Sequence, residues 1–181
     1  MKKEFFTLLL IVASVIFADK AQAQNAFHVS VNPGMVLESN QDKKFGLGGT
    51  LALMIEDRFM LNRPAYYVTF GVKGFNNPFG EGKLISSIFN KETDAFNYVA
   101  FLAGYRMTQD NFANGWYFEP RFGYAAGSGY GAFVLAPVGG YAYNNFDFGV
   151  FADLGFGGKE SIIGNKNFYT LGLTIGYNIG F

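Results

Sequence analysis

The sequence predicts an all-β protein, an eight-stranded antiparallel up-and-down barrel, from the alternation of its residues and from its composition. Odd positions from 169 onward all carry large apolar side chains: Tyr169, Leu171, Leu173, Ile175, Tyr177, Ile179 and Phe181. The even positions between them carry Thr, Gly or Asn. Because successive side chains of a strand point to opposite faces of the sheet, this period of two indicates a β-strand. Aromatic residues make up 19% and charged residues 15% of the chain, with 24 glycines, which is typical of many short strands joined by tight turns.

The two faces of this last strand indicate a membrane-spanning barrel. Its small face, mostly Gly and Thr, is too small and uncharged for a solvated surface and suits a crowded interior. Its bulky face has aromatic residues at both ends of an aliphatic middle, as expected of a face that meets lipid. An open sheet would leave its edge amides unpaired in lipid, so the strands are expected to close on themselves. A soluble eight-stranded lipocalin-like carrier is the alternative fold, and it requires the bulky faces to point inward.

Residues 1–23 are predicted to be a cleavable signal peptide, which leaves 24–181 as the barrel domain. Lys2 and Lys3 give a positive start, residues 5–18 carry no charge, and the small residues of Ala21-Gln22-Ala23 precede the expected cut. The 14 uncharged residues would span about 21 Å as a helix, too short for the roughly 30 Å hydrocarbon core of a bilayer. We therefore expect an exported protein whose membrane spans are strands.

Alternation places eight strands in the mature chain. Their predicted ranges are 26–38, 45–55, 65–74, 95–107, 116–127, 132–143, 146–158 and 167–181. An even number of strands puts both termini on one side, the periplasmic side, and leaves 39–44, 75–94, 128–131 and 159–166 as the outer connections. Asn144 and Asn145 form the clearest turn, since Asn tolerates left-handed backbone geometry. Pairing across this turn sets Ala142 opposite Asp147, and position 136 opposite position 153.

Charged residues within the predicted strands fall on inward positions. Six of them are Lys73, Arg106, Glu119, Arg121, Asp147 and Asp153. None falls on a lipid-facing position, where Lys or Arg at mid-membrane would cost about 2–4 kcal/mol. The interior of an eight-stranded barrel is about filled by its own side chains, so we expect a plug of paired charges. Arg106, Glu119, Arg121 and Asp147 are expected to form one network across the lumen. A gate for protons or small ions is the alternative.

No catalytic, metal or cofactor site is predicted. His28 and Ser30 resemble the His-x-Ser of outer-membrane lipid A deacylases, but they face inward, away from lipid, and no second motif element is present. His28 is the only histidine, and a lone inward His is more often a hydrogen-bonded packing residue. The Asp, Glu and His residues show no metal-site spacing, and the chain has no cysteine. Without its leader the chain has 11 basic and 12 acidic residues, which gives no electrostatic case for nucleic-acid binding.

The outer connection 75–94 is the remaining candidate site. Leu84, Ile85, Ile88 and Phe89 lie there within a polar stretch. Either they extend the flanking strands above the membrane as a ribbon, or they make an exposed apolar patch for a protein partner or surface ligand.

Aromatic residues near the strand ends are predicted to form two interfacial girdles. One girdle holds Tyr66, Trp116, Tyr143, Phe146, Tyr177 and Phe181, and the other holds Phe45, Phe75, Phe133, Phe156 and Tyr169.

In length and alternation, most clearly over 116–124 and 169–181, the mature chain resembles the small bacterial outer-membrane barrels of the OmpX and OmpA-transmembrane-domain type. The resemblance implies a Gram-negative outer-membrane protein in contact with outer-membrane lipids and lipopolysaccharide. It also implies insertion by the barrel-assembly machinery, which recognises a closing strand that ends in an aromatic residue, here Tyr177, Ile179 and Phe181. We expect a structural or surface-interaction role through the outer loops, without enzymatic activity. A narrow porin-like barrel for small solutes or ions, and a lipid A-modifying enzyme, are the alternatives.

Overall fold

The structure, a computed structural model, describes residues 25–37, 44–57, 66–77, 96–127, 130–157 and 167–181. In these ranges it has ten β-strands in one antiparallel sheet. They are β1 (Asn25–Leu37), β2 (Phe45–Glu56), β3 (Tyr66–Asn77), β4 (Phe96–Thr108), β5 (Gly115–Glu119), β6 (Arg121–Gly127), β7 (Tyr130–Leu135), β8 (Val138–Tyr143), β9 (Phe146–Gly157) and β10 (Asn167–Gly180). Within the same ranges there is no helix long and apolar enough to cross a membrane. The predicted signal peptide lies outside them.

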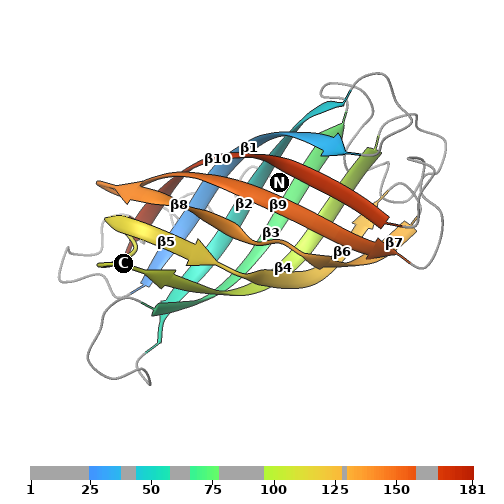
Figure 1. The fold of residues 1–181 in the computed structure, drawn as a ribbon. Coiled ribbons are helices and arrows are strands. Elements are labelled where there is room, and N and C mark those ends of the chain that lie inside the picture. The colour runs from blue at the N-terminus through green and yellow to red at the C-terminus, as the bar shows by residue number, and fades with distance from the viewer. Residues whose placement is uncertain (1–24, 38–43, 58–65, 78–95, 128–129, 158–166) are drawn as a thin grey trace, which may run out of the picture.

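The sheet closes on itself, as Figure 1 shows. β1 pairs with β2 on one side and with the last strand, β10, on the other. β10 also pairs with β9, so the first and last strands meet at a seam inside a continuous ladder. Each of the ten strands has a hydrogen-bonded neighbour on both sides, which leaves none of them as an exposed edge.

Two prolines split two of the long strands without shifting their register. Pro120 separates β5 from β6, and Pro137 lies between β7 and β8. Proline has no N–H to give to the ladder, so the assigned strands end there. Paired residue numbers add up to 257 both between β5 and β8 and between β6 and β7, so the pairing continues across the break. Counted as one strand each, β5–β6 and β7–β8 confirm the closed eight-stranded barrel.

Side-chain direction follows the predicted alternation. In β10, Leu171, Leu173 and Ile175 are 51–57% exposed, whereas Thr174 and Asn178 are 3% and 1% exposed. Large apolar side chains therefore cover the outside of the barrel, and small or polar side chains fill its bore. This orientation is the reverse of the one that a lipocalin-like carrier requires.

The hairpin at Asn144 and Asn145 is confirmed. Both residues have positive φ, 50° and 70°, in the left-handed region that Asn tolerates. Ala142 pairs with Asp147 as predicted. The pairs Leu135–Leu154 and Val138–Phe151 keep the same register, which sets position 136 opposite position 153.

The third strand is longer than predicted, and the outward position given to Phe75 is wrong. β3 continues to Asn77, so residues 75–77 extend the ladder with β4 instead of beginning the outer connection. Phe75 has the same parity as Lys73 and is fully buried in the bore. The turn-like sequence Asn76-Asn77 favours an early strand end, but cross-strand pairing decides otherwise. The four apolar residues of the candidate surface loop lie outside the described residues: Leu84, Ile85, Ile88 and Phe89.

Glycines on the inner face make room for large inward aromatic rings. Gly155 on β9 lies directly opposite Phe168 on β10, and a Cβ at 155 would overlap the Phe168 ring. A Cβ at Gly34 would lie 2.9 Å from Cζ of Phe151. Because the bore of an eight-stranded barrel is narrow, such rings fit where the facing residue has no side chain. This explains why the inward face is rich in glycine.

Candidate functional site in the lumen

A buried ion pair lies near the end of the barrel that holds the Asn144–Asn145 turn. Arg106 on β4 and Asp147 on β9 form a two-pronged contact, with Nη1–Oδ2 at 2.6 Å and Nη2–Oδ1 at 3.0 Å. Both side chains are at most 1% exposed. The guanidinium also lies 3.8 Å above the ring of Tyr117 on β5. Planar contact with a carboxylate on one side and a ring on the other is the geometry for which arginine is suited.

Asn178 joins this ion pair to the seam between the first and last strands. His28 on β1 is the direct cross-strand partner of Asn178, and His28 Nδ1 lies 2.8 Å from Asn178 Oδ1. The Asn178 Nδ2 group donates to Asp147 Oδ1 at 2.9 Å and to the carbonyl of Phe112 at 3.0 Å. Ser30 donates to Asn32 at 3.5 Å. His28 is thus a hydrogen-bonded packing residue, held by Asn178 and lying 3.5 Å from Asp147.

A second pair of charges lies on the strand next to Arg106. Glu119 and Arg121 stand two residues apart on the inward face of β5–β6, with Arg121 Nε 3.6 Å from Glu119 Oε1. Thr69 on β3 donates its hydroxyl to Glu119 at 2.7 Å. Among the four residues expected to form one network, the direct ion-pair contacts are Arg106 with Asp147 and Arg121 with Glu119.

The other two predicted lumen charges pair in the opposite half of the barrel. Lys73 Nζ lies 2.6 Å from Asp153 Oδ2, and both side chains are 1% exposed. Tyr98 donates its hydroxyl to the same carboxylate. The ammonium group also stands 3.4 Å from the centre of the Phe151 ring. All six sequence-predicted charges are buried, and each has an oppositely charged partner.

An aromatic layer fills the bore around and beyond Lys73. Its rings have centroid separations of 4.9–6.5 Å and come from β3, β4, β7, β9 and β10. They belong to Phe75, Phe96, Tyr98, Tyr130, Phe151 and Phe168. The alternation along each strand is the signal that identifies them. Tyr98 is an even number of residues from the inward-facing Arg106 on β4, and Phe151 is two residues from the inward-facing Asp153 on β9.

Sequence reasoning missed Phe112, in the connection between β4 and β5. Its ring is 7% exposed and packs edge-on against Tyr67, with centroids 5.9 Å apart. Its backbone N–H donates to the Tyr67 hydroxyl at 3.3 Å. The available signal is a single large aromatic within the polar stretch 109–114, where a solvated turn would carry none.

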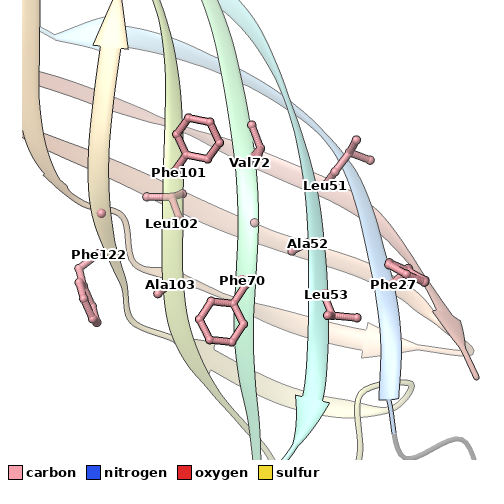
Figure 2. A pocket seen from close by; sticks show the side chains of 12 residues that line it. Phe27, Leu51, Ala52, Leu53, Phe70, Val72, Phe101, Leu102, Ala103 and Phe122 are labelled. Atoms are coloured by element: carbon pink, nitrogen blue, oxygen red, sulfur yellow. The ribbon is translucent and has the colours of Figure 1, made fainter.

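The outer wall holds a shallow apolar hollow of about 560 Å³. Figure 2 shows its side chains over β1–β4 and β6, with Phe70, Phe101 and Phe122 around the small side chain of Ala103. These three rings are 52–67% exposed, so the hollow belongs to the outside and not to the bore. Among the described residues, no charged side chain lines it. Across the described part of the chain, no group of three or more His, Cys, Asp or Glu residues is arranged to hold a metal ion.

No protein-family model matches the chain, and no curated protein matches it. Among solved structures, the chain is similar to the crystal structure of Ail, the attachment invasion locus protein of Yersinia pestis, in complex with the heparin analogue sucrose octasulfate. The two chains are 13% identical with a TM-score of 0.47, over 85% of this chain and 97% of Ail.

Replacing Asp147 by Ala should destabilise the barrel by about 3–5 kcal/mol, because it leaves Arg106 buried without a counter-charge. The double variant Arg106→Met/Asp147→Leu should lose much less, since it removes both charges and keeps apolar volume. Equilibrium unfolding in urea, followed by the fluorescence of the single tryptophan, Trp116, measures both variants. An equal loss in the single and the double variant would contradict a role for charge pairing.

Proposed function

We propose that the chain is a Gram-negative outer-membrane barrel whose bore is filled by its own side chains, and that it serves a structural or surface-interaction role through its outer connections. The observation that carries this proposal is the distribution of side chains across the wall. Exposed Leu, Ile, Val and Phe cover the outside, while all six charged residues of β3–β9 lie inside. Water as the outer solvent would favour the opposite distribution.

The aromatic residues at the barrel ends support membrane placement. Trp116 and Tyr143 are 66% and 67% exposed near the Asn144–Asn145 turn, and Phe45 and Phe156 are exposed near the other end. Amphipathic rings at two levels, with aliphatic side chains between them, match the girdles of a transmembrane barrel.

An arginine on the proposed lipid-facing wall should oppose insertion. Leu173→Arg places a charge in the middle of β10 and should cost about 2–4 kcal/mol in a bilayer. Asn144→Arg, in the exposed turn, is the matched control and should insert normally. Folding into lipid vesicles, read by heat-modifiable gel mobility, compares the two variants. If Leu173→Arg inserts as well as Asn144→Arg, or makes the protein soluble and folded without lipid, the membrane assignment is wrong.

Contacts at the C-terminus support a role for it in assembly. We propose that residues 1–23 direct export, that 24–181 form the barrel, and that Tyr177, Ile179 and Phe181 are the signal for the barrel-assembly machinery. Phe181 stacks on Phe27 of β1 with centroids 5.0 Å apart, and its N–H donates to the carbonyl of Asn25 at 3.0 Å. Phe181 therefore contacts the first strand, at the seam that assembly must close.

The filled bore predicts a barrel without steady conductance. The charge pairs and the aromatic layer occupy the lumen with side chains, in keeping with the small diameter of an eight-stranded barrel. Planar-bilayer recordings of the purified protein should therefore show no sustained current above that of the bare membrane. A stable open level in most insertions would favour the narrow porin-like alternative.

The proposed surface role rests on the outer connections. Residues 38–44, 78–95, 128–129 and 158–166 contain six Lys and six Asp or Glu, so they carry no net charge with which to attract an ionic partner. Their apolar residues are the more distinctive feature, above all Leu84, Ile85, Ile88 and Phe89. We propose that these four contact a protein partner or surface ligand through apolar surface.

Replacing Leu84, Ile85, Ile88 and Phe89 together by Ser should lower surface adhesion without affecting the barrel. Cells that produce the native protein should adhere to hydrocarbon droplets several-fold more than cells that produce the variant. Equal heat-modifiable mobility of the two proteins is the control for correct insertion. Unchanged adhesion at equal surface amounts would argue against an exposed apolar patch.

A further inference from the structure

We propose that residues 109–114 form a lid across the periplasmic mouth of the barrel and control the access of water and small hydrophilic solutes to its lumen. The lid is the connection between β4 and β5. The assignment of this mouth to the periplasm rests on the membrane placement proposed above.

The lid extends across the mouth of the barrel and contacts strands on the far side. Around the barrel, β10 is separated from β4 by β1, β2 and β3, and from β5 by β7–β8 and β9. Asn178 on β10 therefore lies almost opposite the point where the lid begins and ends, yet it donates to the carbonyl of Phe112 at 3.0 Å. The Phe112 ring is buried with Ala26 of β1, Met54 of β2 and Tyr67 of β3.

Hydrogen bonds from three directions fix the lid in this position. The Phe112 N–H donates to the Tyr67 hydroxyl at 3.3 Å, and the Phe112 carbonyl accepts from Asn178 Nδ2. The backbone of Asn145, in the neighbouring turn, donates to the carbonyl of Ala113 at 3.1 Å. Within the lid, Asn111 Oδ1 accepts from the N–H groups of Ala113 at 2.8 Å and of Asn114 at 3.0 Å. The lid is thus an ordered segment with its one large apolar side chain turned inward.

A polar section of the lumen lies behind the lid. Asn32 accepts from Thr50 at 2.9 Å and donates to Thr174 at 3.0 Å. Arg121 Nε is buried there without a hydrogen-bond partner among the described residues. Buried polar groups of this kind are normally satisfied by water. The Phe112 cluster bounds this section on one side, and the aromatic layer bounds it on the other.

Asn178 couples the lid to the ion pair. Its one Nδ2 group donates both to Phe112 and to Asp147, which holds Arg106. Lifting the lid therefore breaks the hydrogen bond between Asn178 and the Phe112 carbonyl, and it removes the Phe112 ring from its contacts with Ala26, Met54 and Tyr67. Both effects favour the closed position.

Cysteine accessibility tests the lid directly, because the chain has no cysteine of its own. Thr50→Cys places a thiol in the polar section, and Asn144→Cys places one in the exposed turn at the same mouth. In proteoliposomes, a small membrane-impermeant methanethiosulfonate reagent should modify Cys at 50 at least 100-fold more slowly than Cys at 144. Adding Phe112→Ala to Thr50→Cys should raise the rate at least tenfold from the periplasmic face alone. Tyr143→Ala, which removes an exposed ring outside the lid, should leave the rate unchanged.

Three outcomes would contradict the proposal of a lid. They are fast modification of Cys at 50 with the native Phe112, an unchanged rate in Phe112→Ala, and an equal rise from both membrane faces. Where Phe112→Ala does not insert, Asn178→Ala is the second variant. It keeps the Phe112 ring, removes the hydrogen bond to the Phe112 carbonyl, and should give the same rise in modification rate from the periplasmic face alone. Heat-modifiable mobility of each variant separates these results from a failure of the membrane assignment, in which case the protein does not enter the vesicles at all.

Discussion

Backbone pairing is the constraint on which the rest of this structure depends. A sheet surrounded by apolar solvent has no water to satisfy an unpaired N–H or C=O, so its strands must close into a ring. The chain meets this constraint at the β1–β10 seam, where residues from Ala26 to Leu37 pair with residues from Tyr169 to Gly180. Pro120 and Pro137 interrupt the ladder locally, but the register on either side is preserved.

Closure with eight strands then dictates what the interior contains. The bore is too narrow for two large side chains to face each other, so rings such as Phe168 lie over glycines such as Gly155. Charges placed there cannot reach bulk water, and a buried charge without a partner is costly. Lys73 pairs with Asp153, and Arg106 with Asp147, at 2.6 Å in both cases. The glycine content, the packing of the rings and the pairing of the charges therefore all follow from the narrow bore of an eight-stranded barrel.

Alternation predicted the closed fold and the direction of nearly every side chain, because direction depends on residue parity alone. The hairpin register also followed from Asn144 and Asn145, which fix a two-residue turn. Phe75 was misplaced because its strand end depends on pairing with β4, and the local sequence favours a turn. Parity places Arg106 and Glu119 inside but does not say which neighbour each contacts. That choice depends on barrel diameter and stagger, which the sequence of one strand does not contain.

Phe112 could not be placed from the sequence for a related reason. Its position depends on Asn178, which lies 66 residues further along the chain, and on Tyr67, which lies 45 residues before it. Asn178 in turn contacts β1 through His28 and β9 through Asp147. These contacts exist together only when β10 has docked between β9 and β1. Closure of the barrel wall and closure of the lid are therefore linked through the Asn178 side chain. A barrel with an open β1–β10 seam would also have an open lid.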